Sequence, residues 1–242
     1  MKNGFAGIAF TVICVTILLS PLIATVLMPR FAMPSRVVET FETYPNGAMP
    51  DTRWTTIFVT PPATSFTTKL LNGNKVGNFI DASTTSWPRL KCNFPTPGPK
   101  SLDIEVGVTV IINSITAEAI YIMFGDCAAG VGFDDIKRFG FVAFGTNANG
   151  MSRNFINVND KFCAGINWAE GDVFDIKFSF VNATGIRCDL RRNGADLAPI
   201  LRSTSFGNSI WTTPINALQF QNLMYGAGGM FDIDIDNICA SW

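Results

Sequence analysis

Three carboxylates in one stretch of the chain could bind a cation. Asp126, Asp134 and Asp135 lie in the glycine-containing segment from Gly125 to Asp135. Hard cations such as Ca²⁺ bind several oxygen ligands, and a loop can arrange its oxygens around one ion. These three aspartates are therefore the candidate calcium ligands. The expectation is that no cofactor is bound, and calcium at these aspartates is the alternative.

A second acidic series, formed by Asp232, Asp234 and Asp236, alternates with apolar residues near the C-terminus. Alternate carboxylates on one extended strand lie about 7 Å apart, which is too far for a single ion to bind all three. The pattern therefore favours a solvated strand face over a metal site. Such a face would also protect the strand from pairing with another chain.

Two tryptophans lie in polar, turn-rich sequence where an exposed ring could stack on a sugar. They are Trp87, in Thr85-Ser86-Trp87-Pro88, and Trp168, in Asn167-Trp168-Ala169-Glu170. Both are candidate ligand-binding residues. The alternative is that their rings belong to the core, where tryptophan is more often found.

Composition excludes several kinds of chemistry. The 242 residues include no histidine, which excludes His-based metal sites, serine triads and Cys–His nucleophile pairs. The net charge of −1 and the charged content of 15% provide no basic surface of the kind that nucleic-acid binding requires. We therefore expect no nucleic-acid partner, and any enzyme would have to work with carboxylates.

The number and spacing of the cysteines favour disulfides, and thus an oxidising compartment, over a zinc site. Cys14 lies in an apolar N-terminal run, whereas Cys92, Cys127 and Cys163 lie in turn-rich sequence, and no CxxC pair occurs. Without that spacing, disulfides are the better expectation than zinc. We predict a disulfide between Cys127 and Cys163. The alternative is a set of unpaired, buried thiols.

The N-terminal segment has the length and composition of a membrane span. No charged residue lies between Lys2 and Arg30, and the run 4–28 is almost wholly apolar. As a helix this run is about 37 Å long, against a hydrocarbon core of about 30 Å. Residues 1–30 are therefore predicted to form a transmembrane anchor or uncleaved signal, followed by a tether at 31–36. A cleaved secretory signal is the alternative.

The orientation of this segment follows from the cysteines more than from its flanking charges. Lys2 flanks one end, and Arg30 and Arg36 flank the other, so the positive-inside rule does not decide. The cysteines and the single span favour a C-terminal domain on the extracytoplasmic side, either periplasmic or extracellular.

Beyond residue 37 the chain alternates as β-strands do. The clearest strand is Asp103–Val110, in which Ile104, Val106, Val108 and Val110 share one face. Shorter strands are expected at Ala119–Phe124, Phe139–Phe144, Phe155–Val158 and Leu218–Leu223. Gly, Asn, Asp and Pro turns separate them, which favours an antiparallel sandwich or barrel.

A hairpin is predicted from Val173 to Arg192, with Cys188 directed into the core. Asn193-Gly194 then supplies the next tight turn. The outward face of the hairpin carries opposite charges that can pair between its strands: Asp175, Lys177, Arg187, Asp189 and Arg191.

Three short motifs resemble the concanavalin A-like, laminin-G-like jelly-roll superfamily. Phe41-Glu42-Thr43-Tyr44-Pro45-Asn46-Gly47 resembles the F-E-x-Y-x-x-G start of bacterial and viral members. The hairpin from Asp175 to Gly194 resembles their central strand pair, and Phe231 to Ile238 resembles their final strand. The resemblance covers residues 37–242. It implies a sandwich that hosts lectins, glycosidases, adhesion modules and structural domains alike.

Some members of this superfamily are β-glucanases that use a Glu-x-Asp-x-Glu strand. The matching stretch of this chain is Ser101-Leu102-Asp103-Ile104-Glu105, in which Ser101 takes the place of the first glutamate. Retaining hydrolysis needs two carboxyl groups about 5 to 5.5 Å apart. Because the nucleophile is missing, we expect no enzyme, and a glycoside hydrolase is only a third hypothesis.

The sequence thus predicts an all-β protein, with an antiparallel jelly-roll β-sandwich at 37–242 preceded by one N-terminal transmembrane α-helix. Its expected role is non-catalytic recognition or assembly, with glycan binding or adhesion as the first hypothesis. The alternative is a structural accessory subunit of a membrane protein complex, virion or surface filament. The expected partners are the lipid bilayer and either a glycan or neighbouring protein subunits.

Overall fold

The chain divides into two compact units, Met1–Arg30 and Phe31–Trp242. Every residue that the computed structural model describes belongs to the second unit. The predicted anchor and the candidates Trp87, Asp134, Asp135 and Cys163 lie outside the described residues. The described residues are 33–34, 36–50, 53–57, 64–83, 88–94, 104–116, 119–127, 136–146, 155–158, 161–162, 167–182, 185–197, 200–203, 217–223 and 230–241.

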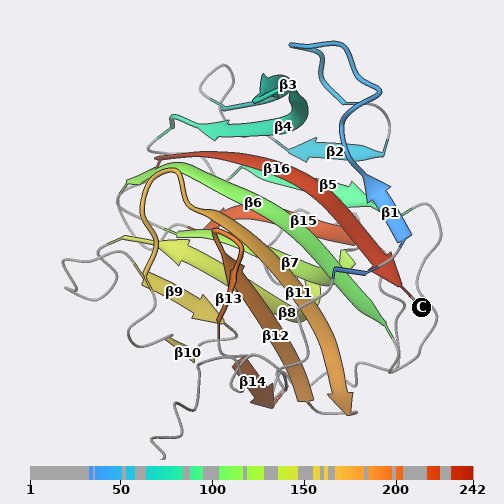
Figure 1. Cartoon of the computed structure of the whole chain (residues 1–242), viewed down its shortest axis with the longest axis vertical. Coiled ribbons are helices and arrows are strands. Elements are labelled where there is room, and N and C mark those ends of the chain that lie inside the picture. Colours follow the sequence, from blue (N-terminus) through green and yellow to red (C-terminus); the bar gives the residue numbers. More distant parts are fainter. Residues whose placement is uncertain are drawn as a thin grey trace, which may run out of the picture. The chain divides into compact units, whose positions relative to one another are not determined.

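Sheet A has nine strands among the described residues. Seven of them run in the order β13-β12-β11-β6-β16-β4-β3. The other two are β1, which pairs with β16, and β14, which pairs with β12. Figure 1 shows β16, β6, β11 and β12 as long neighbouring strands. The strands are β1 (Arg36–Glu39), β3 (Thr64–Leu71), β4 (Asn74–Asp81), β6 (Glu105–Thr116), β11 (Val173–Asn182), β12 (Gly185–Arg192), β13 (Ala195–Asp196), β14 (Ile200–Ser203) and β16 (Met230–Ser241).

Sheet B has seven strands in the order β10-β9-β8-β7-β15-β5-β2, and all of its pairs are antiparallel. Together the sheets form an all-β sandwich, with no helix in the described part of the chain. The strands are β2 (Trp54–Ile57), β5 (Arg89–Asn93), β7 (Ala119–Cys127), β8 (Ile136–Gly145), β9 (Phe155–Val158), β10 (Lys161–Phe162) and β15 (Ala217–Leu223).

Strands occur at all of the predicted places, and several are longer than expected, although β6 begins at Glu105 and Asp103 lies outside the described residues. β6 continues to Thr116, and β7 continues to Cys127. The predicted inward residues Val106, Val108 and Val110 are fully buried. The alternation of side chains therefore identified both the strands and the faces that they bury.

The predicted hairpin is also confirmed, and its register places opposite charges across from one another. Asp175 lies opposite Arg191, and Lys177 lies opposite Asp189. The buried thiol of Cys188 faces the core, as its alternation with apolar neighbours predicted. Asn193 and Gly194 both have positive φ, 51° and 81°, so they form the two-residue turn that leads from β12 into β13.

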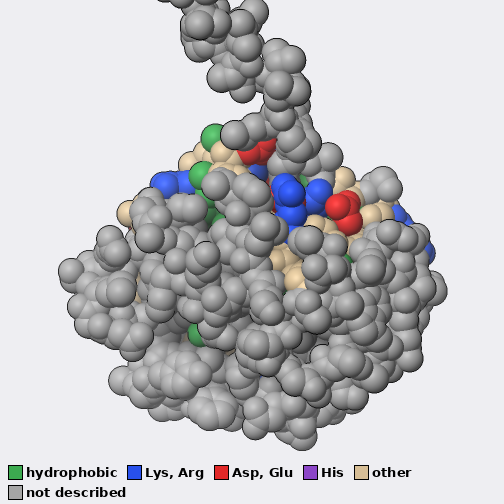
Figure 2. All heavy atoms as spheres, turned by 90° about the horizontal axis from the view of Figure 1, so that it is seen from below, with side chains coloured by type: hydrophobic (Ala, Val, Ile, Leu, Met, Phe, Trp, Pro, Cys, Tyr) green, Lys and Arg blue, Asp and Glu red, His purple; other side chains and the backbone are tan. Residues whose placement is uncertain are grey.

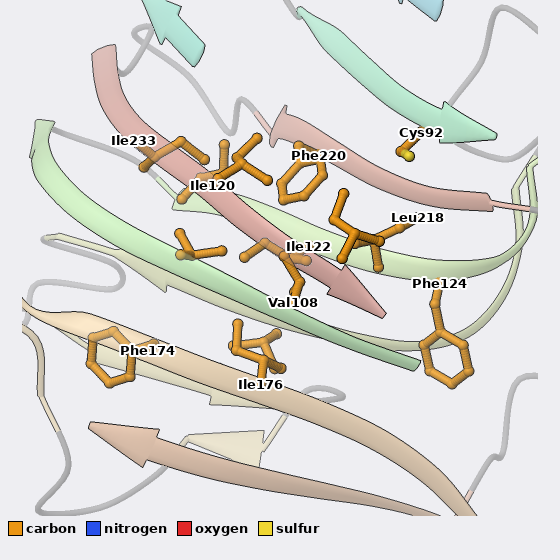
Figure 3. Close-up of a cluster of buried hydrophobic side chains, with 14 of the residues drawn as sticks. Cys92, Val108, Ile120, Ile122, Phe124, Phe174, Ile176, Leu218, Phe220 and Ile233 are labelled. Atoms are coloured by element: carbon orange, nitrogen blue, oxygen red, sulfur yellow. The ribbon is translucent and has the colours of Figure 1, made fainter. Parts of the chain in front are cut away.

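Aromatic contacts join the two sheets across the core. The Phe124 ring of β7 stacks on the Phe178 ring of β11, with centroids 4.6 Å apart. Trp54 of β2 contacts Phe66 of β3 at 4.6 Å. Figure 3 shows side chains of both sheets meeting, among them Val108 of β6 and Leu218 of β15. Burial of these large side chains is the main stabilising contribution to the sandwich.

Polar contacts also join the sheets, and one of them is centred on Asp81. Asp81 ends β4 of sheet A, and Asn222 lies on β15 of sheet B; both are buried. The Asn222 amide donates to Asp81 Oδ2 at 3.1 Å, while Thr64 Oγ1 and the Ser83 N–H donate to Oδ1. A buried carboxylate is tolerated because its oxygens accept these hydrogen bonds.

The opening motif packs over β4. Phe41 has a φ of 63° and no exposed surface. The preceding carboxylate, Glu39, is buried and accepts hydrogen bonds from the Phe41 N–H, Tyr44 Oη and Trp54 Nε1. The motif therefore closes one side of the core with a buried hydrogen-bond network.

Candidate functional site

Trp168 lies in the core and not at the surface. Its side chain is 3% exposed, and its Nε1 donates to the carbonyl oxygen of Gly145 at 2.9 Å. A ring in this position has no face open to a sugar, so the structure does not support Trp168 as a stacking platform. The other candidate, Trp87, lies outside the described residues.

The calcium candidates fall mostly outside the described residues. Asp126 belongs to β7, where it lies opposite Lys137 of β8. It is therefore part of a strand and not of the expected loop. Asp134 and Asp135 are not among the described residues. Within the described ranges, no group of three or more Cys, Asp or Glu side chains could hold a metal ion.

One of the two cysteines of the predicted disulfide also lies outside the described residues. Cys127 ends β7, and Cys163 is not described, so the pairing stays a prediction. Cys92 was expected in a turn, but it lies in β5 and is fully buried. Cys239 is a free thiol near Asp236, and burial followed by the charge of that aspartate raises its pKa.

The acidic series on β16 is not a solvated edge. β16 pairs with β6 on one side and with β4 on the other, and Asp234 is only 1% exposed. The expectation of a solvated, edge-protecting face is therefore wrong for this residue. Its neighbours on adjacent strands cover it, and these partners are distant in the sequence.

Amides and one ammonium group surround the β16 carboxylates. Asn78 Nδ2 donates to Asp232 Oδ1 at 2.7 Å and to Asp234 Oδ1 at 2.8 Å. Lys69 Nζ lies 2.8 Å from Asp234 Oδ1, and Asn113 Nδ2 donates to Asp232 at 3.0 Å. Because an ammonium group already neutralises Asp234, a metal ion has little to gain at this cluster.

Further charges on the outer face of sheet A also pair with one another. Arg191 Nη1 lies 3.6 Å from Asp175 Oδ2, and Lys177 Nζ lies 3.9 Å from Asp189 Oδ2, as the hairpin predicted. Glu105, the last residue of the glucanase-like stretch, is 3.2 Å from Lys177 Nζ. Figure 2 shows basic and acidic side chains side by side among the described residues of its view. These charged side chains of sheet A therefore form ion pairs with one another.

Sheet B presents a different outer face, which we call the sheet B face. Leu90, Phe220 and Ile122 point into the core, so the residues that alternate with them on β5, β15 and β7 point away from it. The sheet B face consists of Arg89, Lys91, Asn93, Gln219, Gln221, Tyr121 and Met123.

Strand register aligns these side chains in two rows. Gln221 lies opposite Arg89 on one side and Tyr121 on the other. In the next row, Gln219 lies opposite Lys91 and Met123. The two glutamines are joined, because Gln219 Nε2 donates to Gln221 Oε1 at 2.9 Å.

These outward-pointing polar side chains lie below the surface. Gln221 is 1% exposed, Gln219 is 5% exposed and Arg89 is 7% exposed, whereas Tyr121 and Lys91 are half-buried. Amides can donate to and accept from vicinal hydroxyl groups, and a tyrosine ring offers an apolar face with a polar tip. Met123, which lies in the same row as Gln219, is fully buried as well, so most of this face is closed to solvent and only Tyr121, Lys91 and Asn93 keep exposed surface.

This face was not predicted from the sequence, although one signal for it exists. Gln219 and Gln221 alternate with Leu218 and Phe220, which marks a strand with one polar face. Nothing local, however, indicates that β5 and β7 flank this strand. Within the described ranges, no helix is long and apolar enough to cross a bilayer.

No protein-family model and no curated protein matches the chain. Solved structures do resemble it. The seed lectin of Lotus tetragonolobus is 8% identical with a TM-score of 0.50, over 79% of this chain and 94% of the lectin. An alginate lyase in complex with an alginate tetrasaccharide is 12% identical with a TM-score of 0.47, over 86% of this chain and 97% of the lyase. A family 11 carbohydrate-binding module from Clostridium thermocellum is 12% identical with a TM-score of 0.41, over 86% and 95%.

The likeness to the Lotus lectin concerns the fold alone, because so few residues are identical. The Lotus seed lectin is a legume lectin, and legume lectins are concanavalin A-like jelly-roll sandwiches. The described all-β sandwich is consistent with that architecture.

Proposed function

We propose that the chain is a non-catalytic glycan-binding module and that the sheet B face is its binding site. The observation that carries the proposal is the row formed by Arg89, Gln221 and Tyr121 on three adjacent strands. On this face Tyr121 and Lys91 keep exposed surface that a ligand could contact, whereas Gln221 and Arg89 are buried. A floor of amides beside a tyrosine suits the hydroxyl groups and apolar ring faces of a saccharide.

The lack of catalysis is part of the same proposal. The described strands β5, β7 (up to Phe124) and β15 supply no carboxylate pair to the sheet B face, and glycoside hydrolysis normally requires two carboxyl groups. On the opposite side of the sandwich, Glu105 is engaged by Lys177 at 3.2 Å. The fold shared with the Lotus seed lectin supports a binding role only in general terms.

Binding is tested with the full chain, extracted in mild detergent and applied to a panel of neutral and acidic polysaccharides. We expect at least one polysaccharide to bind and Tyr121→Ala or Gln219→Ala to weaken that binding about tenfold, the loss of about one good hydrogen bond or stacking contact. The matched control is Asn113→Ala, which removes an amide from the outer face of sheet A.

The outcomes that would overturn the proposal are specific. If no polysaccharide binds and the protein elutes as a stable larger assembly, a structural subunit replaces the glycan-binding module. Equal losses for Tyr121→Ala and Asn113→Ala would remove the site from the sheet B face. Release of reducing ends from a bound polysaccharide would show that the protein is an enzyme.

We further propose that residues 1–30 hold the module at a membrane, with the sandwich on the extracytoplasmic side. The support is the uncharged apolar run between Lys2 and Arg30. Mass spectrometry of the membrane-extracted protein tests the anchor, since an N-terminus at Met1 is expected. A mature N-terminus near residue 25 would instead show a cleaved signal.

A further inference from the structure

Three side chains from adjacent strands meet on the outer face of sheet A. They are Lys69 of β3, Asn78 of β4 and Asp234 of β16, and these strands are neighbours in the order β16-β4-β3. Asn78 lies opposite Asp234 on one side and opposite Thr67 on the other. Lys69 is two residues beyond Thr67, so it projects from the same face. The three strands thus bring together a primary amine, a primary amide and a carboxylate.

One oxygen atom of the carboxylate contacts both nitrogen atoms. Lys69 Nζ lies 2.8 Å from Asp234 Oδ1, and Asn78 Nδ2 donates to the same oxygen at 2.8 Å. An amine that attacks an amide carbon must lose protons, whereas the amide nitrogen must gain them in order to leave. A carboxyl group in contact with both nitrogens can make both transfers. The arrangement therefore suits the transfer of the Asn78 acyl group to Lys69.

Burial favours the discharge of the ion pair between Lys69 and Asp234. The Asp234 side chain has no exposed surface and Asn78 is 7% exposed, and within the described part of the chain no group donates to Asp234 Oδ2. A buried carboxylate with an unsatisfied oxygen is unfavourable. When a proton passes from Lys69 to Asp234, both charges disappear and Nζ becomes an uncharged nucleophile. The Lys69 side chain is 36% exposed, so a released ammonium ion can leave for solvent.

We propose that Lys69 and Asn78 form an intramolecular isopeptide bond, with Asp234 as the proton carrier. The bond from Lys69 Nζ to Asn78 Cγ forms, and the bond from Cγ to Nδ2 breaks. Of the three protons on the ammonium group, one stays on the new amide and two leave with Nδ2 as an ammonium ion, so no oxidant or further reactant is needed. The product ties β3, which ends the strand order of sheet A, to β4. This modification does not depend on glycan binding.

The native chain tests the proposal without any substitution. The purified full chain is denatured, digested with trypsin and analysed by tandem mass spectrometry. An unlinked chain gives the separate peptides 54–69, 70–75 and 76–89. Trypsin does not cleave after an acylated lysine, so the isopeptide bond gives peptide 54–75 joined to peptide 76–89. We expect this joined species at a mass about 17 Da below the sum of the two peptides, through the loss of ammonia.

Variants assign the reacting groups. Lys69→Arg should abolish the joined species, because the guanidinium group keeps the charge but stays protonated and is no nucleophile. Asp234→Asn should reduce its yield at least about tenfold, because the amide cannot carry the protons. Lys75→Arg is the matched control on the same hairpin, and its yield should equal that of the native chain. Circular dichroism and thermal unfolding identify any variant that is not folded.

Three outcomes would overturn the proposal. Separate peptides alone from the native chain would show that Lys69 and Asp234 form an ion pair and nothing more. A species about 18 Da lighter, in which Lys69 is joined to the peptide that contains Asp234, would assign the bond to the aspartate instead of Asn78. An undiminished yield in folded Asp234→Asn would remove the carboxylate from the reaction.

Discussion

The ring of Phe41 lies directly against Gly77, so that a Cβ built on this glycine would be 2.5 Å from Phe41 Cε1. Phe41 comes from the opening motif, and Gly77 comes from the middle of β4. The glycine therefore leaves the space that the buried ring fills. This contact explains why an otherwise unfavourable residue for a strand interior is present in β4.

Replacing this glycine should destabilise the domain. In Gly77→Ala the new methyl group would overlap the Phe41 ring, and overpacking of this kind costs about 1–3 kcal/mol. Denaturant unfolding measures the loss. The double variant with Phe41→Leu should lose less than the sum of the two single changes, because the smaller side chain makes room. Simple additivity would contradict the contact.

Gly107→Ala provides a comparison for Gly77→Ala. A Cβ at Gly107 would lie 2.7 Å from Pro34 Cδ and 2.8 Å from Met33 Cε, and these atoms belong to the tether and not to the core. We expect the smaller loss for Gly107→Ala.

Loss of the Asn222 amide, which binds Asp81 across the two sheets, should lower the stability of the domain. Asn222→Ala leaves Asp81 Oδ2 buried without the amide that now donates to it at 3.1 Å. An unsatisfied buried acceptor costs about 1–3 kcal/mol, and the same denaturant assay measures it. Asn93→Ala is the control, since its amide bonds lie nearer the surface. Equal effects of the two substitutions would contradict the special role of this link.

Trp168 should behave as a core residue. Trp168→Ala is expected to lose about 3–5 kcal/mol of stability, as large-to-small core substitutions do. Trp168→Phe should retain most of the packing and lose only the bond to Gly145, about 1 kcal/mol. Glycan affinity per folded molecule should not change in Trp168→Phe. A stable Trp168→Ala protein with reduced affinity would restore the ligand-binding role predicted from the sequence.

Asp236 should make stability depend on pH. Burial, together with the nearby charges of Glu42 and Glu39, raises the pKa of Asp236 from 3.8 to about 6, against the opposing hydrogen bond from the Asn237 N–H. The folded state therefore prefers the neutral carboxyl group. The stabilising contribution is fully present below pH 3.8 and is lost as the pH rises through about 6.

Asp236→Asn tests this dependence, because the amide is neutral at every pH. Thermal unfolding between pH 4 and 8 should show the variant to be more stable than the native chain at pH 7, and the slope between pH 4 and 6 should flatten. An unchanged slope in the variant would assign the pH dependence to other groups.

The sequence alone determined most of the local structure. Alternation placed Val106, Val108 and Val110 in the core and fixed the faces of the hairpin strands, because a strand directs successive side chains to opposite sides. The two residues Asn193-Gly194 specified their turn, since that turn requires positive φ at both positions. These signals are local, so they can be read without knowledge of the partners of a strand.

The tertiary structure alone decided which strands are neighbours. Asp234 looked like part of a solvated edge, but β16 lies between β6 and β4, where Lys69 and Asn78 cover it. The sheet B face likewise brings together β5, β15 and β7, which are far apart in the chain. Alternation gives a strand two faces but does not name the strands beside it, because pairing depends on contacts over long sequence separations.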